Sequence, residues 1–168
     1  DTLLYPARYE RTIAAVGATY THVPYVYALH NRQVRAEGGK YMQMSYGPES
    51  AMKTAIAGYT PNVPWFSHMN DRSFPHYYTL NGGGTSSATP QVAAAAALYI
   101  QKYRTELDQI AGKDKWKIVE IVKAALFRSA KLDPQYRKYY GNGILKAKDA
   151  LAISPASVVQ HIKLSPEA

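Results

Sequence analysis

The stretch Gly84–Leu98, which reads GTSSATPQVAAAAAL, decides more about this 168-residue chain than any other segment. A glycine-rich loop, Asn81–Gly84, leads into it, and its alanine-rich continuation is apolar on every side. Glycine allows close backbone approach and unusual dihedral angles, whereas an apolar run of this kind is typical of a helix buried on all faces. We therefore expect a buried helix over about Ser86–Arg104, with Pro90 within roughly its first turn.

A serine at the junction of such a loop and helix is well placed for nucleophilic catalysis. The first-turn N–H groups have no intrahelical partner, and the helix dipole favours negative charge beside them. The backbone N–H of Ser86 is therefore a candidate oxyanion donor. The alternative is an ordinary core helix in which Thr85 or Ser86 is the N-cap. A serine nucleophile also needs a general base and an orienting group for that base, and the sequence shows neither.

The seven residues Gly84–Pro90 resemble the Gly-Thr-Ser-x-Ala-x-Pro signature of the subtilisin-like serine proteases, the subtilases. This match assigns the family's nucleophile to Ser86 and not to Ser87. Other family elements follow in the same order along residues 5–152. They are Tyr5–Tyr9, similar to Tyr-Pro-Ala-x-Tyr; Ile13–Ala18, similar to the Ile-Ala-Val-Gly-Ala strand; Ser45–Pro48, similar to Ser-x-x-Gly-Pro; and Tyr140–Leu145, similar to Tyr-Gly-x-Gly-x-Leu.

The resemblance implies an α/β fold. Residues 1–152 would be the C-terminal part of a three-layer catalytic domain, with a mainly parallel sheet and a buried nucleophile helix, and residues 153–168 would be a tail. The implied activity is peptide-bond hydrolysis through an acyl-enzyme on Ser86. Gly84, Thr85 and Leu4 would belong with Ser86 to the oxyanion and substrate-binding site. Leu4 is included because the residue before Tyr-Pro lies near the base of the family's primary specificity pocket; the alternative is a core leucine.

The rest of the family's machinery is absent from this chain. No Asp-Ser/Thr-Gly or His-Gly-Thr motif occurs, and the oxyanion asparagine is expected upstream of Tyr5. We therefore expect the isolated chain to be essentially inactive, with an upstream segment as its partner. The histidines, none of which precedes Gly-Thr, are His22, His30, His68, His76 and His161.

Two other functions stay open. The chain could be a non-catalytic interaction domain derived from a subtilase, a pseudoprotease. A net charge of +8, with most basic residues after Lys102, allows a nucleic-acid-binding module, but no nucleic-acid motif accompanies the charge and solvated helix faces explain it. We therefore expect polypeptide substrates and no nucleic acid.

The amino-acid composition excludes only a few kinds of site and segment. The absence of cysteine excludes disulfides and cysteine metal sites within the chain, and no stretch predicts a transmembrane helix. No metal site and no cofactor are expected for the chemistry, and structural calcium is possible by the resemblance alone. The resemblance also suggests secretion or a cell-envelope location.

The remaining pattern predicts a strand near residues 12–18, irregular structure and short strands over 20–79, and a second helix near 115–130 after a charged loop. A turn at Asp133-Pro134, a hairpin-like element at Gly141–Gly143 and a short helix near 146–152 follow. Part of a parallel sheet is a poor folding unit, so we expect an exposed apolar surface on this chain alone.

Overall fold

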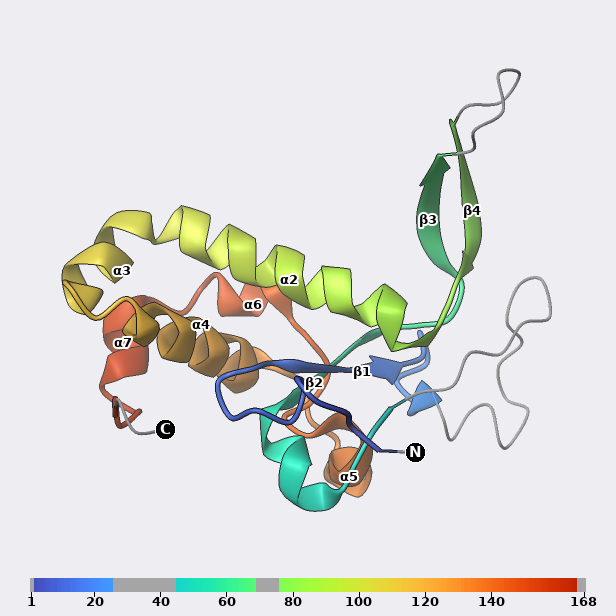
Figure 1. Ribbon diagram of the computed structural model, residues 1–168, viewed down its shortest axis with the longest axis horizontal. Coiled ribbons are helices and arrows are strands. Elements are labelled where there is room, and N and C mark those ends of the chain that lie inside the picture. The colour runs from blue at the N-terminus through green and yellow to red at the C-terminus, as the bar shows by residue number, and fades with distance from the viewer. Residues whose placement is uncertain (1, 26–44, 69–75, 166–168) are drawn as a thin grey trace.

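The computed structural model describes residues 2–25, 45–68 and 76–165, and Figure 1 shows their arrangement. Its elements in chain order are β1 (Ala14–Ala18), the 3₁₀ helix η2 (Glu49–Thr54), β2 (Ala55–Tyr59), β3 (Val63–His68), β4 (His76–Gly82), α2 (Gly84–Lys102), α3 (Arg104–Ala111), α4 (Trp116–Ser129), the 3₁₀ helix η3 (Pro134–Tyr136), α5 (Arg137–Tyr140), α6 (Ala147–Ala150) and α7 (Pro155–Val159).

A pair of parallel strands forms the centre of the fold. β1 and β2 pair from Ala14 opposite Ala55 to Ala18 opposite Tyr59. Their sequences, AAVGA and AIAGY, are uncharged and almost wholly buried, as expected for parallel strands covered on both faces. The strand predicted near residues 12–18 is confirmed as β1.

Helices lie on both faces of these strands, so the fold has three layers (Figure 1). On one face, Ile56 joins a core cluster with α2 and α4 that includes Tyr99 and Leu126. On the other face, Val16 belongs to a cluster with residues of η2 and α5. Neighbouring residues of a strand point to opposite faces, so each strand contributes to both clusters. The predicted α/β class with a parallel sheet is confirmed.

The glycine-containing segment before α6 extends the sheet and is not a hairpin. The N–H of Ala57 donates to the Gly143 carbonyl at 2.8 Å, and the N–H of Leu145 donates to the Ala57 carbonyl at 2.9 Å. Ile144 therefore bridges in parallel to Ala57 on β2, and it also bridges antiparallel to Lys131. The hairpin-like interpretation of Gly141–Gly143 is wrong, because this segment pairs with a distant strand.

The helix boundaries differ from the predicted ones in three places. α2 begins two residues before Ser86, so Pro90 is its seventh residue and lies beyond the first turn. The N-cap is Gly83, with extended backbone angles of φ −140° and ψ 175°, so the prediction that Thr85 or Ser86 caps the helix is wrong. The expected charged loop before α4 contains α3, which buries Leu107 and Ala111 at helical spacing. The helix near 115–130 is confirmed as α4.

Burial of α2 is confined to one side. Val92, Ala95 and Tyr99 face the core, whereas Ala94, Ala97 and Leu98 are exposed. The sequence predicted burial on all faces, but the described residues supply the sheet and α4 on the inner side only. An apolar groove of about 470 Å³ also opens between α2, α4 and the start of β1. Its lining residues include Ile13, Ala15, Val92, Ala96, Ile118 and Val122. The chain thus has the exposed apolar surface expected of it.

β3 and β4 form an antiparallel hairpin that projects away from the three layers (Figure 1). Phe66 pairs with Tyr78, and a bulge lies between Val63 and Trp65. Within the described residues, each of these strands contacts mainly the other strand. The hairpin leads through Gly83 directly into α2.

The C-terminal segment returns to the body of the fold. Residues 153–168, distinguished as a tail in the sequence, contain α7, which packs on α3 and α4 and buries Val158. Asp133 accepts a hydrogen bond from the Gln135 N–H at the start of η3, where the Asp-Pro turn was predicted. Among the described helices, none combines the length and the apolar character that a membrane crossing requires.

Candidate active site

Ser86 is the third residue of α2, and its side chain is exposed. The adjacent Ser87 is buried, and its hydroxyl donates to the Gly83 carbonyl at 3.1 Å. Of the two serines at this helix end, Ser86 therefore presents its hydroxyl to solvent. Gly83 has no side chain with which to cap the helix, so the first-turn N–H groups stay available beside Ser86. Their partial positive charge suits an anion or a developing oxyanion.

The glycines before Ser86 meet two different requirements. Gly84 has φ +66°, a left-handed conformation that glycine adopts without a steric penalty. At Gly82 the requirement is space, because a Cβ atom there would lie 2.7 Å from the Val63 carbonyl oxygen and 3.0 Å from the Ser87 hydroxyl. The loop can therefore bring β3, β4 and the start of α2 together only with glycine at these positions.

Thr85 lies half-buried between these glycines and Ser86. Its carbonyl accepts a hydrogen bond from the Thr89 hydroxyl at 2.9 Å. Pro90 has no N–H, so it cannot donate to the carbonyl of Ser86, four residues earlier. Near its start, α2 therefore lacks one backbone hydrogen bond, at Pro90, and contains a side-chain hydrogen bond from Thr89 to the Thr85 carbonyl.

Gln91 attaches this end of α2 to the end of β2. Its amide nitrogen donates to the carbonyls of Tyr59 and Ser87, each at 2.8 Å, and its amide oxygen accepts from the Tyr59 N–H at 3.0 Å. All three bonds reach backbone groups, so the side chain links strand and helix at a defined distance. The sequence analysis missed Gln91; its signal was a lone amide side chain opening an otherwise apolar run.

Gly58 permits the closest contact between β2 and α2. A Cβ atom at this position would lie 2.9 Å from both the Cα and the Cβ of Ala88, which is below normal contact distance. Both residues are buried. The helix bearing Ser86 is therefore set directly against the sheet, and Gly58 is a second positioning residue that the sequence analysis did not identify.

Leu4 lies on the surface with 67% of its area exposed. The alternative interpretation of Leu4 as a core residue is therefore wrong, and the buried residue is its neighbour Leu3, whose N–H donates to the Gly47 carbonyl at 2.7 Å. Exposure is compatible with a substrate contact, but no hydrogen bond or ring contact of the described residues links Leu4 to Ser86.

The side chains of His22 and His161 bond to groups other than Ser86. His22 forms a 3.1 Å hydrogen bond with the Tyr59 hydroxyl, and His161 lies 2.8 Å from the Ser157 carbonyl on α7. In the part of the chain that the structure describes, no hydrogen bond joins Ser86 Oγ to a histidine. Burial, followed by the positive charges of Lys131 and Lys146, lowers the pKa of His22. His30 lies outside the described residues, as do the side chains of His68 and His76.

Several acidic and basic side chains of the described chain form ion pairs, at exposed positions and at partly buried ones. Lys115 pairs with Asp108 at 2.7 Å, and Lys123 pairs with Glu120 at 3.0 Å. Lys115 is the main reason that the pKa of Asp108 is lowered. Among the described side chains, no group of three or more histidines and carboxylates is arranged to hold a metal ion.

Comparison with protein families agrees with this arrangement. The family model of the subtilases, peptidase family S8, matches residues 1–143. The match covers β1, β2, the hairpin, α2 and its serine, and it extends into the glycine segment that pairs with β2. No curated protein matches the chain.

Proposed function

The chain belongs to the subtilase family of serine proteases, and on this premise we propose that it carries the nucleophile of a serine endopeptidase, Ser86. The observation that carries the proposal is the contrast between two adjacent serines. Ser86 is exposed at the open end of α2, whereas Ser87 is buried and hydrogen-bonded to Gly83. A nucleophile must reach a substrate carbonyl, and Ser86 alone of the pair presents its hydroxyl.

In the proposed reaction, Ser86 Oγ attacks the carbonyl carbon of a peptide bond. A histidine base takes the hydroxyl proton as the new C–O bond forms, and an aspartate orients that base. The N–H of Ser86 and an asparagine side chain hold the oxyanion of the tetrahedral intermediate. The C–N bond then breaks, the leaving amine takes the proton from the histidine, and water later hydrolyses the acyl-enzyme.

We propose that the histidine, the aspartate and the asparagine come from a segment upstream of this chain. Among the described residues, no histidine is hydrogen-bonded to Ser86, and the sequence lacks both the Asp-Ser/Thr-Gly and the His-Gly-Thr motif. The apolar groove beside α2, lined by Val92, Ala96 and Ile100, is consistent with a further segment covering this side of the helix. On this account the isolated chain is inactive, and polypeptides are the substrates of the complete protein.

The test is peptide-bond hydrolysis by the full-length protein that includes the upstream segment. We expect cleavage of an unfolded protein substrate by the wild type, none by Ser86→Ala, and unchanged cleavage by Ser50→Ala, a matched change at an exposed serine of η2. Cleavage that survives Ser86→Ala would contradict the assignment. A correctly folded full-length protein without any cleavage would instead favour the non-catalytic, pseudoprotease alternative.

A further inference from the structure

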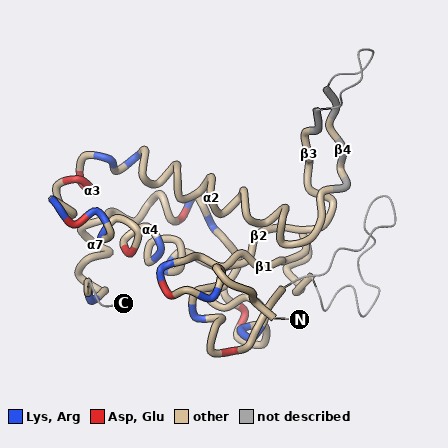
Figure 2. Tube along the Cα trace, viewed as in Figure 1, with Lys and Arg blue, Asp and Glu red and all other residues tan. Residues whose placement is uncertain are grey.

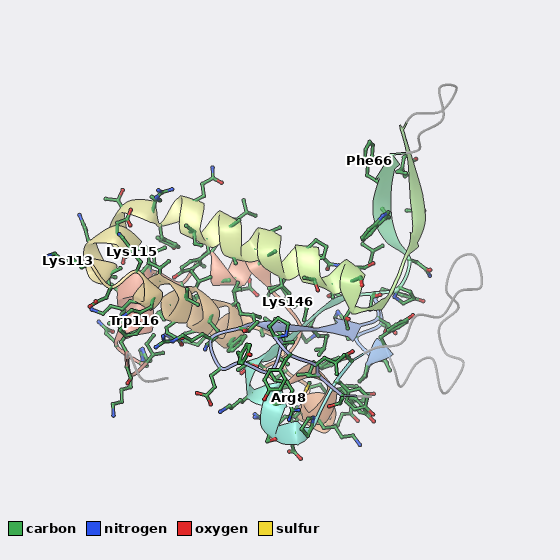
Figure 3. The ribbon with its side chains drawn as sticks, in the orientation of Figure 1. Arg8, Phe66, Lys113, Lys115, Trp116 and Lys146 are labelled. Atoms are coloured by element: carbon green, nitrogen blue, oxygen red, sulfur yellow. The ribbon has the colours of Figure 1, made fainter. Side chains whose placement is uncertain are left out.

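The β3–β4 hairpin presents one apolar face. Phe66 and Tyr78 are cross-strand partners and are 70% and 74% exposed. Leu80, two residues beyond Tyr78 on β4, is 52% exposed and lies on the same face, because side chains alternate along a strand. Figure 3 shows Phe66 projecting from β3 on the side toward which α2 extends. We call Phe66, Tyr78 and Leu80 the hairpin face.

No acidic residue, lysine or arginine belongs to the described strands that form this face. The strands Val63–His68 and His76–Gly82 contain no Asp, Glu, Lys or Arg, and α2 has none before Lys102. The charged residues gather instead over α3, α4, α5 and the adjoining loops (Figure 2). Large apolar side chains grouped on an exposed surface usually mark an interaction site. A binding partner would meet the hairpin face through apolar contact and not through charge.

The opposite side of the hairpin is held at its base. Trp65 precedes Phe66 on β3, so its side chain lies on the opposite face of the hairpin. Its ring carbon Cε3 would lie 3.5 Å from a Cβ atom at Gly82. Gly82 in turn approaches Ser87 at the start of α2. The base of the hairpin is therefore joined to the helix end that carries Ser86, while the hairpin face is left exposed.

Chain connectivity keeps the hairpin face near Ser86. Leu80 and Tyr78 precede Ser86 by six and eight positions, so they are at most about 22 and 29 Å from it even along a fully extended chain, and Phe66 pairs with Tyr78. A peptide substrate has the same reach, so a residue within about eight positions of the scissile bond can contact the hairpin face. Tyr78 and Leu80 lie one two-residue strand repeat apart, about 6.5–7 Å, which matches alternate side chains of an extended peptide.

From these observations we propose that the hairpin face is a specificity site that binds apolar side chains of the polypeptide substrate within about eight residues of the cleaved bond. The proposal rests on the proposed endopeptidase function and names its preferred substrate class. Phe66, Tyr78 and Leu80 are substrate-binding residues on this account and take no part in the bond-making steps.

The experiment compares two peptides cleaved by the full-length protein. Both share the four residues on each side of the scissile bond, and they carry either leucines or serines at the next four positions on both sides. In the double variant Phe66→Ser/Tyr78→Ser we expect kcat/KM for the leucine peptide to fall about tenfold, through a higher KM, with no change for the serine peptide. The rate of fluorophosphonate labelling at Ser86 should stay unchanged. Tyr9→Ser, at an exposed aromatic outside the hairpin, is the matched control.

Each other outcome overturns the inference in a recognisable way. An equal loss on both peptides, or no loss on either, means that the hairpin face does not select apolar residues. If the double variant keeps its peptide preference but loses binding to phosphatidylcholine vesicles, the face is a lipid contact. Wild-type protein without labelling or hydrolysis removes the proposed function itself, and with it this inference.

Discussion

The first turn of α2 and the β3–β4 hairpin are adjacent in the chain, yet the structure fixes them very differently. The N-terminal turns of α2, Gly84–Gln91, which we call the anchored region, are attached to β2 through Gln91 and lie directly against it where Ala88 meets Gly58. The described hairpin strands contact mainly each other and expose Phe66 and Tyr78. A nucleophile needs a position fixed by its surroundings, whereas a recognition surface must stay open to its ligand. Under the proposed function, the first of these segments positions the nucleophile and the second recognises the substrate.

The largest effect should come from filling the space between β2 and α2. In Gly58→Ala the new methyl group would meet Ala88 at 2.9 Å, so the helix must shift. We expect the free energy of unfolding to fall by about 1–3 kcal/mol. A displacement of about 1 Å at Ser86 would also lower kcat/KM by about 10²-fold.

Urea unfolding and peptide hydrolysis by the full-length protein measure these two quantities. Ala97→Ser is the control, because Ala97 is an exposed residue of the same helix. A Gly58→Ala protein as stable and active as the control would show that close contact with β2 does not position Ser86.

Removal of the Gln91 link should have the next largest effect. Gln91→Leu deletes three hydrogen bonds and leaves the N–H and carbonyl of Tyr59 without their side-chain partner. Since unsatisfied buried polar groups are costly, we expect a loss of about 1–2 kcal/mol in the free energy of unfolding. Gln101→Leu, at an exposed position of the same helix, should change stability by less than about 0.5 kcal/mol. Equal values for the two variants would remove Gln91 from the anchored region.

Substitutions on the hairpin face should change stability much less than those in the anchored region. Phe66→Ser/Tyr78→Ser removes two exposed side chains that form one cross-strand pair, so we expect the free energy of unfolding to fall by no more than about 1 kcal/mol. The same urea titration provides the comparison with Gly58→Ala. A loss above about 1 kcal/mol, the range of a structural site, would mean that this face is packed and that the two segments do not differ as described.

The smallest effect concerns pH. The pKa of His22 is lowered chiefly by burial, so below about pH 6.5 the unfolded chain binds more protons at this residue than the folded chain does. Stability contributed by neutral His22 is therefore complete at higher pH and declines as pH falls below that value. His22 bonds to Tyr59, whose backbone Gln91 holds, so acid should act on the anchored region.

An NMR titration of the His22 ring should give a pKa below that of an exposed histidine. Lys131→Ala should bring the value closer to normal, because Lys131 contributes to the shift. Unfolding measurements at two pH values should show a weaker pH dependence in His22→Asn than in the wild type. A pKa at or above the ordinary value would contradict the burial argument.

The sequence predicted the parts of this fold whose signals are local. β1, the serine-bearing helix and α4 follow from apolar runs and helical spacing, and the loop of glycines before Ser86 follows from residue type. The helix α3 was not predicted, because its many charged residues are typical of a loop and only two apolar residues, Leu107 and Ala111, recur at helical spacing.

Contacts between residues far apart in the chain could not be predicted from local sequence patterns. Gln91 acquires its role from Tyr59, a residue 32 positions away. The choice between Leu3 and Leu4 as the buried residue depends on the bond from Leu3 to Gly47. The N-cap at Gly83 and the pairing of Ile144 with Ala57 likewise arise from tertiary structure. The position of Ser86 was thus predictable, whereas the contacts that position it were not.

The most direct test of the central claim, that Ser86 is an activated nucleophile, is covalent labelling of the full-length protein with a fluorophosphonate at neutral pH, followed by intact mass and peptide mapping. We predict one label per molecule, on Ser86, absent from Ser86→Ala and retained in Ser50→Ala. We also predict no label on the isolated chain. A label on Ser87, or none on a folded full-length protein, would contradict the claim.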